Sequence, residues 1–135
     1  MAYNQQPKAE FGIITKSKTL VEYTVRVTTS SKFPKKYRFV YGNRIMDSTM
    51  DILDFVVEAN ESNIQDPREF ADRQYYQKRV LTRCKTTLNL IEAMLASKAI
   101  STQQCAEWSR LVLDVRNMTL AWRNKDLARA QQIPQ

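Results

Sequence analysis

Apolar residues recur at helical spacing along most of the chain, and the clearest run lies between residues 34 and 60. Its main stripe contains Phe39, Met46, Met50, Leu53 and Val57, with Ile45, Ile52 and Val56 beside it. Steps of three, four or seven residues place side chains on one face of an α-helix. Pro34 lacks a backbone N–H and fits the first turn of a helix. We therefore predict a helix from Pro34 to about residue 60, with the main stripe facing the core.

The segment before Pro34 gives a weaker pattern. Leu20, Tyr23 and Val27 form a helical stripe. However, this segment is rich in β-branched valine and threonine, which favour strands locally. A strand here would have no obvious partner in the rest of the chain, so we predict a helix over residues 14–32. It ends before Pro34, because the residue preceding a proline is disfavoured in the helical region.

Two capping signals mark the remaining helices. Asp66, Pro67 and Glu69 predict a third helix, which extends to about residue 97. Ser101 and Gln104 form a capping-box pattern that opens a fourth helix, ending between residues 123 and 131. The inner faces should carry Tyr76, Val80, Cys84, Leu88, Ile91 and Leu95 on the third helix, and Cys105, Trp108, Leu111, Val112, Val115, Met118 and Trp122 on the fourth.

Four amphipathic helices joined by short links favour an all-α fold, an antiparallel up-down four-helix bundle. The 135 residues suffice for one domain, and only two are glycine, which agrees with few turns. We expect a flexible N-terminal tail over residues 1–12 and the bundle over residues 13–131.

The composition excludes several kinds of chemistry. The chain has no histidine, and so lacks the commonest general base and zinc ligand. Cys84 and Cys105 match no metal-binding or redox spacing, so we predict two buried thiols. We expect no enzymatic activity and no cofactor. The first fifteen residues lack the apolar block of a signal peptide, and no run approaches the ~20 apolar residues of a membrane span. A cytoplasmic protein without membrane contact is the expectation.

The net charge of +7 is concentrated in the second half of the chain. Residues 66–135 hold 12 Lys and Arg against seven Asp and Glu. In a hairpin of the third and fourth helices, the start of one lies near the end of the other. The candidate binding residues on this hairpin are Arg73, Lys78, Arg79, Arg83, Arg116, Arg123 and Arg129. Such a cluster is typical of proteins that bind nucleic-acid phosphates, although a solvated helix face is the alternative for any one residue.

Two further features have open interpretations. An acidic stripe runs along the second helix at Asp47, Asp51, Asp54, Glu58 and Glu61. It could hold metal ions, but the absence of histidine favours a solvated edge or a docking surface for a basic partner. Trp108 and Trp122 fit the core of the fourth helix, and Trp122 could instead lie at a subunit interface.

The stretch Phe33-Pro-Lys-Lys-Tyr-Arg-Phe-Val-Tyr-Gly-Asn-Arg-Ile resembles a family motif. The motif opens the second helix of four-helix-bundle proteins that include those encoded in bacterial ribosomal-RNA intervening sequences and the accessory variability proteins of diversity-generating retroelements. The residues that match are Phe33, Pro34, Lys35, Arg38, Gly42 and Ile45. The closing segment, residues 118–123, also resembles the accessory proteins, with Trp122 and Arg123 at its end.

The resemblance to the accessory proteins implies a non-enzymatic homopentamer with a basic surface. It would bind a reverse transcriptase and template RNA, and support mutagenic cDNA synthesis. By placement, Arg79, Arg83, Arg116 and Arg123 are candidates for contacts to RNA or to the polymerase. The alternative is an interaction module of the intervening-sequence type with no nucleic-acid role.

Overall fold

The computed structural model describes residues 8–131, with side chains from residue 12 onward. Within these residues the structure contains no strand. Its four α-helices are α1 (Lys8–Thr28), α2 (Asn43–Glu61), α3 (Pro67–Ala96) and α4 (Thr102–Ala130). Residues 1–7 of the expected tail lie outside the described residues, and α1 already includes residues 8–12.

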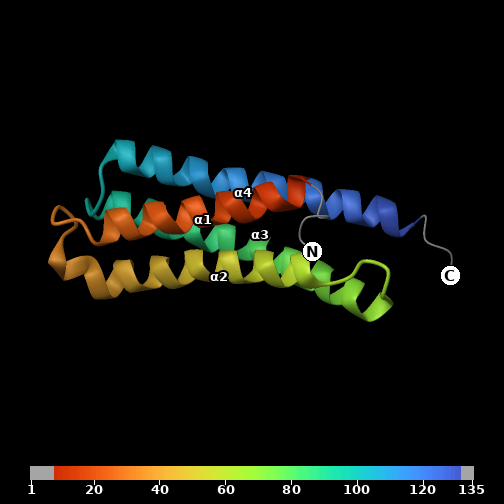
Figure 1. Cartoon of the computed structure of the whole chain (residues 1–135). Helices are drawn as coiled ribbons and strands as arrows, with labels where there is room; N and C mark the ends of the chain where they lie inside the picture. Colours follow the sequence, from red (N-terminus) through yellow and green to blue (C-terminus); the bar gives the residue numbers. More distant parts are fainter. Residues whose placement is uncertain (1–7, 132–135) are drawn as a thin grey trace.

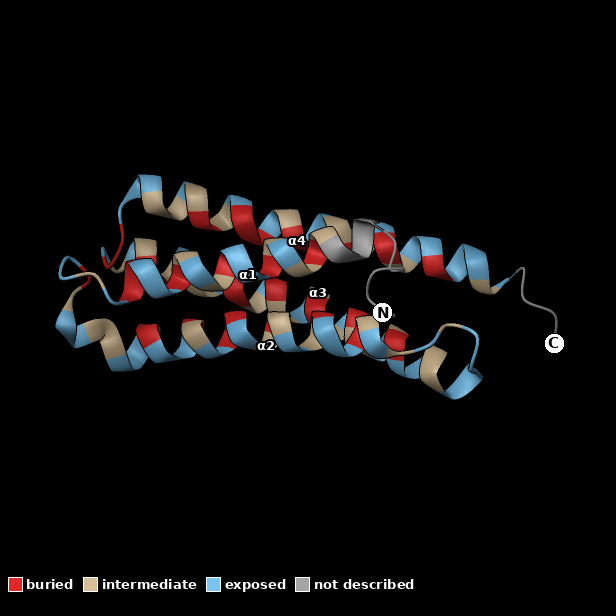
Figure 2. Cartoon of the chain, in the orientation of Figure 1, coloured by how far each residue is buried: buried red, intermediate tan, exposed pale blue. Residues whose placement is uncertain are grey.

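The four helices lie side by side (Figure 1). α1 packs on α2 and α4, and α3 packs on the same two helices. The link between α1 and α2 and the link between α3 and α4 lie at one end, and the link between α2 and α3 lies at the other (Figure 1). The buried residues of each helix lie along the side that meets its neighbours (Figure 2). The all-helical prediction is therefore confirmed.

Helix α1 is helical in spite of its many β-branched residues. The hydroxyls of Ser17, Thr24 and Thr28 are buried, and each donates to the carbonyl four residues earlier at 2.8 Å. This back-bonding satisfies the hydroxyl within the helix itself, so threonine and serine can occupy core positions. Thr24 Oγ1 also accepts a 3.0 Å hydrogen bond from the indole of Trp108 on α4. The predicted helix is confirmed, but it begins at Lys8 and ends at Thr28, whereas we placed it over residues 14–32.

The start of the second predicted helix is not a regular α-helix. Lys35–Tyr37 form a 3-10 turn, Arg38–Gly42 form a π-helical turn, and α2 begins only at Asn43. In the π-turn the amide of Asn43 donates to the carbonyl of Arg38, five residues earlier. Such a turn holds one residue more than an α-helical turn and changes the phase of the side chains. Phe39, within this turn, is 82% exposed, so its predicted place on the apolar face was wrong.

The core face of α2 lies beside the predicted one. Met50 and Val57 of the predicted stripe are exposed, whereas the expected flanking residues Ile52 and Val56 are fully buried. The buried set of α2 is Ile45, Ser48, Thr49, Ile52, Val56 and Ala59. Ser48 belongs to it because its hydroxyl meets Thr87 of α3 at 2.7 Å. A stripe chosen by apolar side chains alone omits such hydroxyl residues. For this reason the predicted core face of α2 lies about one residue position from the observed one.

The starts of α3 and α4 follow their capping signals. Asp66 Oδ1 accepts from the amide of Arg68 at 2.9 Å, although Glu69 accepts from Asn63 and not from Asp66. Ser101 and Gln104 form the predicted capping box, with distances of 2.9 and 3.1 Å. Both tryptophans are buried in the core.

Candidate nucleic-acid interface

Four cations surround a shallow groove between α3 and α4. Lys78 and Lys85 stand two helical turns apart on α3, and Arg116 and Arg123 stand two turns apart on α4. The groove has a volume of about 680 Å³, and the remaining lining residues are Leu81, Thr82, Leu88 and Leu120. We call this site the basic groove. It combines three of the candidate residues with Lys85.

The contacts between α3 and α4 explain how the four cations come together. Gln77 Nε2 donates to Asp126 Oδ2 at 2.7 Å, which fixes the register of the two helices. Arg123 lies one turn before Asp126 and therefore beside Lys78. At the other end, the charge of Arg116 acts on Cys84, the neighbour of Lys85. The two pairs are separated by about 10 Å along the helices.

The basic groove has an unbalanced charge. No Asp or Glu is among its described lining residues, and none of its cations forms an ion pair within residues 12–131. Among the described residues, Arg116 donates only to the side chain of Asn117, at 3.3 Å. Like charges held around one groove create a positive potential that attracts a polyanion, and this attraction weakens as salt is added. Burial beneath the groove raises the pKa of the Cys84 thiol to about 12, which keeps this side chain neutral.

Arg73 belongs to the interior and not to the binding surface that we predicted. Its side chain is 6% exposed, and Nε lies 2.6 Å from Oδ2 of the fully buried Asp126. Nη2 donates to the other carboxylate oxygen at 3.0 Å, and the guanidinium lies over the ring of Trp122 at 4.9 Å. Arg129 approaches the same carboxylate at 3.6 Å. The buried carboxylate of Asp126 therefore balances the charge of Arg73 and part of that of Arg129.

Arg79 and Arg83 face a different neighbour. The guanidinium of Arg79 lies over the ring of Phe55 on α2, 5.3 Å from its centroid. Arg83 Nε lies 3.6 Å from Oδ2 of Asp51, which is one of the acidic stripe residues of α2. Both side chains are half-buried. The structure thus divides the predicted cluster into three places: the basic groove, the α2–α3 interface and the buried site of Asp126.

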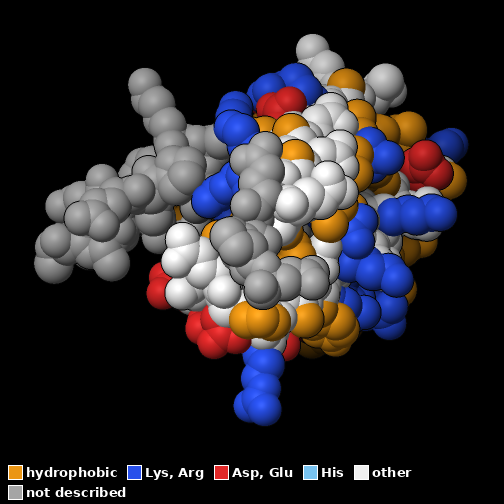
Figure 3. Space-filling model, turned by 90° about the vertical axis from the view of Figure 1, so that its right-hand side faces the viewer, with side chains coloured by type: hydrophobic (Ala, Val, Ile, Leu, Met, Phe, Trp, Pro, Cys, Tyr) orange, Lys and Arg blue, Asp and Glu red, His pale blue; other side chains and the backbone are white. Residues whose placement is uncertain are grey.

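Lys85 was absent from the predicted site, although its spacing in the sequence could have indicated it. Lys85 follows Lys78 by seven residues, just as Arg123 follows Arg116. Residues seven apart share a helix face, and two such pairs on adjacent helices can line the same groove. The space-filling view along the bundle shows Lys and Arg side chains gathered on its right-hand side (Figure 3).

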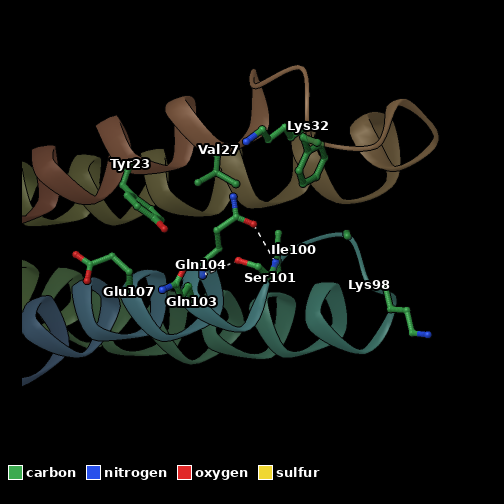
Figure 4. Close-up of a pocket in the computed structure, with 11 residues that line it drawn as sticks. Tyr23, Val27, Lys32, Lys98, Ile100, Ser101, Gln103, Gln104 and Glu107 are labelled. Atoms are coloured by element: carbon green, nitrogen blue, oxygen red, sulfur yellow. Dashed lines mark hydrogen bonds between the residues drawn. The ribbon is translucent and has the colours of Figure 1, made fainter.

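A second hollow, lined by polar and apolar side chains, lies where the end of α1 meets the start of α4 (Figure 4). Tyr23, Gln104 and Glu107 are among its lining residues. Partial burial and the nearby Glu107 carboxylate raise the pKa of Tyr23, so this phenol stays protonated. Gln104 is already used in the capping box, and Glu107 accepts from Arg110 at 2.6 Å. This hollow can accept or donate hydrogen bonds, but it contains no activated nucleophile among the residues described.

The structure also shows where the acidic stripe and the two cysteines lie. Four of the five acidic stripe residues are exposed, and the fifth, Asp51, is paired with Arg83. In the described part of the chain, no group of three or more Cys, Asp or Glu could hold a metal ion. Neither cysteine forms a disulfide; Cys84 is buried and Cys105 is half-buried. None of the helices within residues 8–131 is both long and apolar enough to cross a membrane.

No family model, curated protein or solved structure matches this chain.

Proposed function

We propose that this protein is a non-enzymatic accessory protein of a diversity-generating retroelement, and that it binds the template RNA and the reverse transcriptase of that element. In this proposal the basic groove is the RNA contact, and the protein supports mutagenic cDNA synthesis by holding the RNA. One observation carries the RNA contact: four cations surround one groove that has no carboxylate in its described lining. The retroelement itself is proposed from the resemblance of residues 33–45 and 118–123.

The proposal includes an antiparallel up-down bundle, since the groove depends on α3 and α4 running in opposite directions. Two long-range contacts support this arrangement. Arg73, near the start of α3, pairs with Asp126, near the end of α4. Tyr41, just before α2, meets Ser97, just after α3, at 2.8 Å. Each contact joins parts of the chain that an up-down bundle brings together.

The character of the groove limits what it would recognise. Its floor is mostly aliphatic, and none of the described residues that line it is aromatic. Without a stacking surface, contacts would be to phosphates, which carry no sequence information. The expected binding is therefore tolerant of sequence and strongly dependent on salt.

The test measures the binding of a fluorescently labelled RNA strand as a function of salt concentration. Replacing all four groove cations by Gln should weaken binding at low salt and reduce the slope of log K against log[salt] by about 3, because each single-strand phosphate contact contributes about 0.7. The matched control removes four exposed charges elsewhere: Lys18, Arg26, Arg68 and Arg110. An equal loss in both variants would show a general charge effect and contradict the proposed groove.

The polymerase part of the proposal has its own test. A reverse-transcriptase gene should lie beside the gene for this protein, and the two proteins should copurify when they are expressed together. If RNA is not retained at low salt, either alone or with the polymerase, the accessory role is wrong. The interaction module of the intervening-sequence type would then be the remaining interpretation.

A further inference from the structure

The irregular turn before α2 leaves a large aromatic side chain in water. Phe39 is 82% exposed, and its neighbour Val40 is 60% exposed. Both belong to the π-helical turn Arg38–Gly42. Short π-helical turns are rare and occur frequently at functional sites.

Side-chain contacts with the end of α3 hold this turn in place. Tyr37 and Tyr41 lie on either side of Phe39 in the sequence, and their rings pack together at 5.3 Å. The hydroxyl of Tyr41 meets Ser97 Oγ at 2.8 Å, and that of Tyr37 donates to the Ser97 carbonyl at 3.3 Å. Phe33, at the base of the turn, is 3% exposed. The exposure of Phe39 therefore results from an anchored backbone and not from a loose loop.

The sequence around Phe39 is strongly basic. Residues 30–46 contain no Asp or Glu, and a further lysine, Lys98, follows Ser97 in the α3–α4 link. We call the region of Phe39, Val40, Lys32, Lys35, Lys36, Arg38, Arg44 and Lys98 the basic tip. The Nε atom of Arg38 is buried and has no hydrogen-bond partner among the described residues.

We infer that the basic tip binds a single-stranded nucleic acid, with an unpaired base stacked on Phe39 and neighbouring phosphates held by the lysines and arginines. Aromatic rings among cations are how proteins hold single strands without reading their sequence. A duplex keeps its bases stacked inside and offers none to Phe39. Two apolar side chains are too few for the roughly 800 Å² that each partner contributes to a stable protein interface, whereas one ring suffices for one base.

This inference rests on the proposed RNA-binding function but uses a different surface. Lys85 of the basic groove and Ser97 below the basic tip are separated by about 18 Å along α3. The two sites differ in chemistry as well, because the groove has an aliphatic floor and the tip has an exposed ring. A strand could bind at either site alone, so the two can be tested separately.

The experiment uses a short RNA strand that carries 2-aminopurine, both alone and annealed to its complement. Phe39→Ala should weaken binding of the single strand about fivefold or more, should remove the fluorescence quenching that stacking causes, and should leave duplex binding unchanged. Phe39→Trp should retain both binding and quenching, because tryptophan also stacks. Val40→Ala is the matched control and should change affinity less than about twofold, because valine has no ring to stack. Phe39 is mostly in water, so thermal melting should confirm that all three variants fold.

Salt dependence separates the two kinds of contact within the tip. Phe39→Ala should leave the salt slope unchanged, since stacking releases no counterions. Lys35→Gln combined with Lys36→Gln should lower the slope by about 1.4.

The outcomes for tip and groove are distinguishable. If Phe39→Ala binds the single strand as the unaltered protein does while the groove variant loses affinity, the inference about the tip is wrong and the proposed groove stands. If Phe39→Ala loses affinity and the groove variant does not, the tip is correct and the proposed groove is wrong. Failure of the unaltered protein to bind any RNA would overturn both, as would Phe39-dependent binding only to vesicles of anionic lipid.

Discussion

Asp126 is the residue on which the end of the bundle depends most directly. Its carboxylate is fully buried, and it accepts from Arg73 and Gln77 at distances from 2.6 to 3.0 Å. The guanidinium of Arg73 also donates to the carbonyl of Ser62 at 3.2 Å, which ties the end of α2 to the same site. A charge in such a place is tolerated only while its partner is present.

Replacing Asp126 by Asn should therefore lower the free energy of unfolding by about 3 kcal/mol, because Arg73 would be left as an uncompensated buried charge. Urea denaturation followed by circular dichroism measures this loss. Asp114→Asn serves as the control, since Asp114 pairs with Lys16 and Arg110 at the surface, and its loss should be under about 1 kcal/mol. Equal losses in the two variants would contradict the role given to Asp126.

The burial of a single residue could be predicted from the sequence only where it depends on helical spacing and not on a contact with a distant part of the chain. The apolar residues of α4, such as Trp108 and Val115, lie where their helical spacing placed them. Arg73 could not be placed in the same way, because its burial depends on Asp126, which is 53 positions away. The buried hydroxyls of Thr24 and Ser48 were missed for a related reason. Their residue type suggests a surface position, and their partners Trp108 and Thr87 lie on other helices.

The 3-10 and π-helical turns before α2 change how the glycine of the resemblance motif is understood. Gly42 has φ −57° and ψ −50°, which any residue adopts in a helix. A Cβ built there would lie 3.7 Å from the ring of Phe33, an ordinary van der Waals distance. Neither the backbone nor the space within one chain requires glycine at this position.

Gly42→Ala should accordingly raise the free energy of unfolding by about 0.4–1 kcal/mol, because alanine restricts the unfolded chain at a compatible site. Thermal or urea unfolding detects this change. Gly12→Ala is an informative comparison, since its new Cβ would lie 3.1 Å from the methyl group of Met118. Because this contact is tight, Gly12→Ala should raise the free energy of unfolding less than Gly42→Ala does. A destabilised Gly42→Ala protein would contradict this account. A stable variant that assembles or binds poorly would instead assign the glycine to a contact with a partner.

Elements with local start signals could be predicted closely, and the irregular turns could not. α3 and α4 begin at Pro67 and Thr102, directly after the predicted caps. The change from 3-10 to π to α geometry over residues 35–43 has no comparable marker in the sequence. It becomes visible only once Tyr37 and Tyr41 are seen to bond with Ser97, more than fifty residues away. The basic groove was predicted in part for the same reason, because its four members come together only through the register of α3 and α4.

Assembly is a property of the whole molecule that we propose from the resemblance alone. A homopentamer should appear by light scattering at about 79 kDa, five times the 15.8 kDa of one chain. Several apolar side chains on α2 and α3, including Met50 and Tyr75, are exposed in the single chain and become candidates for burial between copies. The measurement belongs at high salt and without RNA, so that bound RNA adds no mass. A mass near 15.8 kDa would contradict the pentamer.

The direction of α4 places its last residues far from the basic tip (Figure 1). α4 ends on the side of the α2–α3 link, and the basic tip lies on the opposite side (Figure 1). A helix of the length of α4 spans about 40 Å, so a dye attached at residue 131 stands that far from Phe39 but much closer to the basic groove. Energy transfer from this dye to one on the end of an RNA strand would report at which of the two sites the RNA end resides. The same geometry means that a protein coupled to a surface through residue 131 would present the tip outward to the solution.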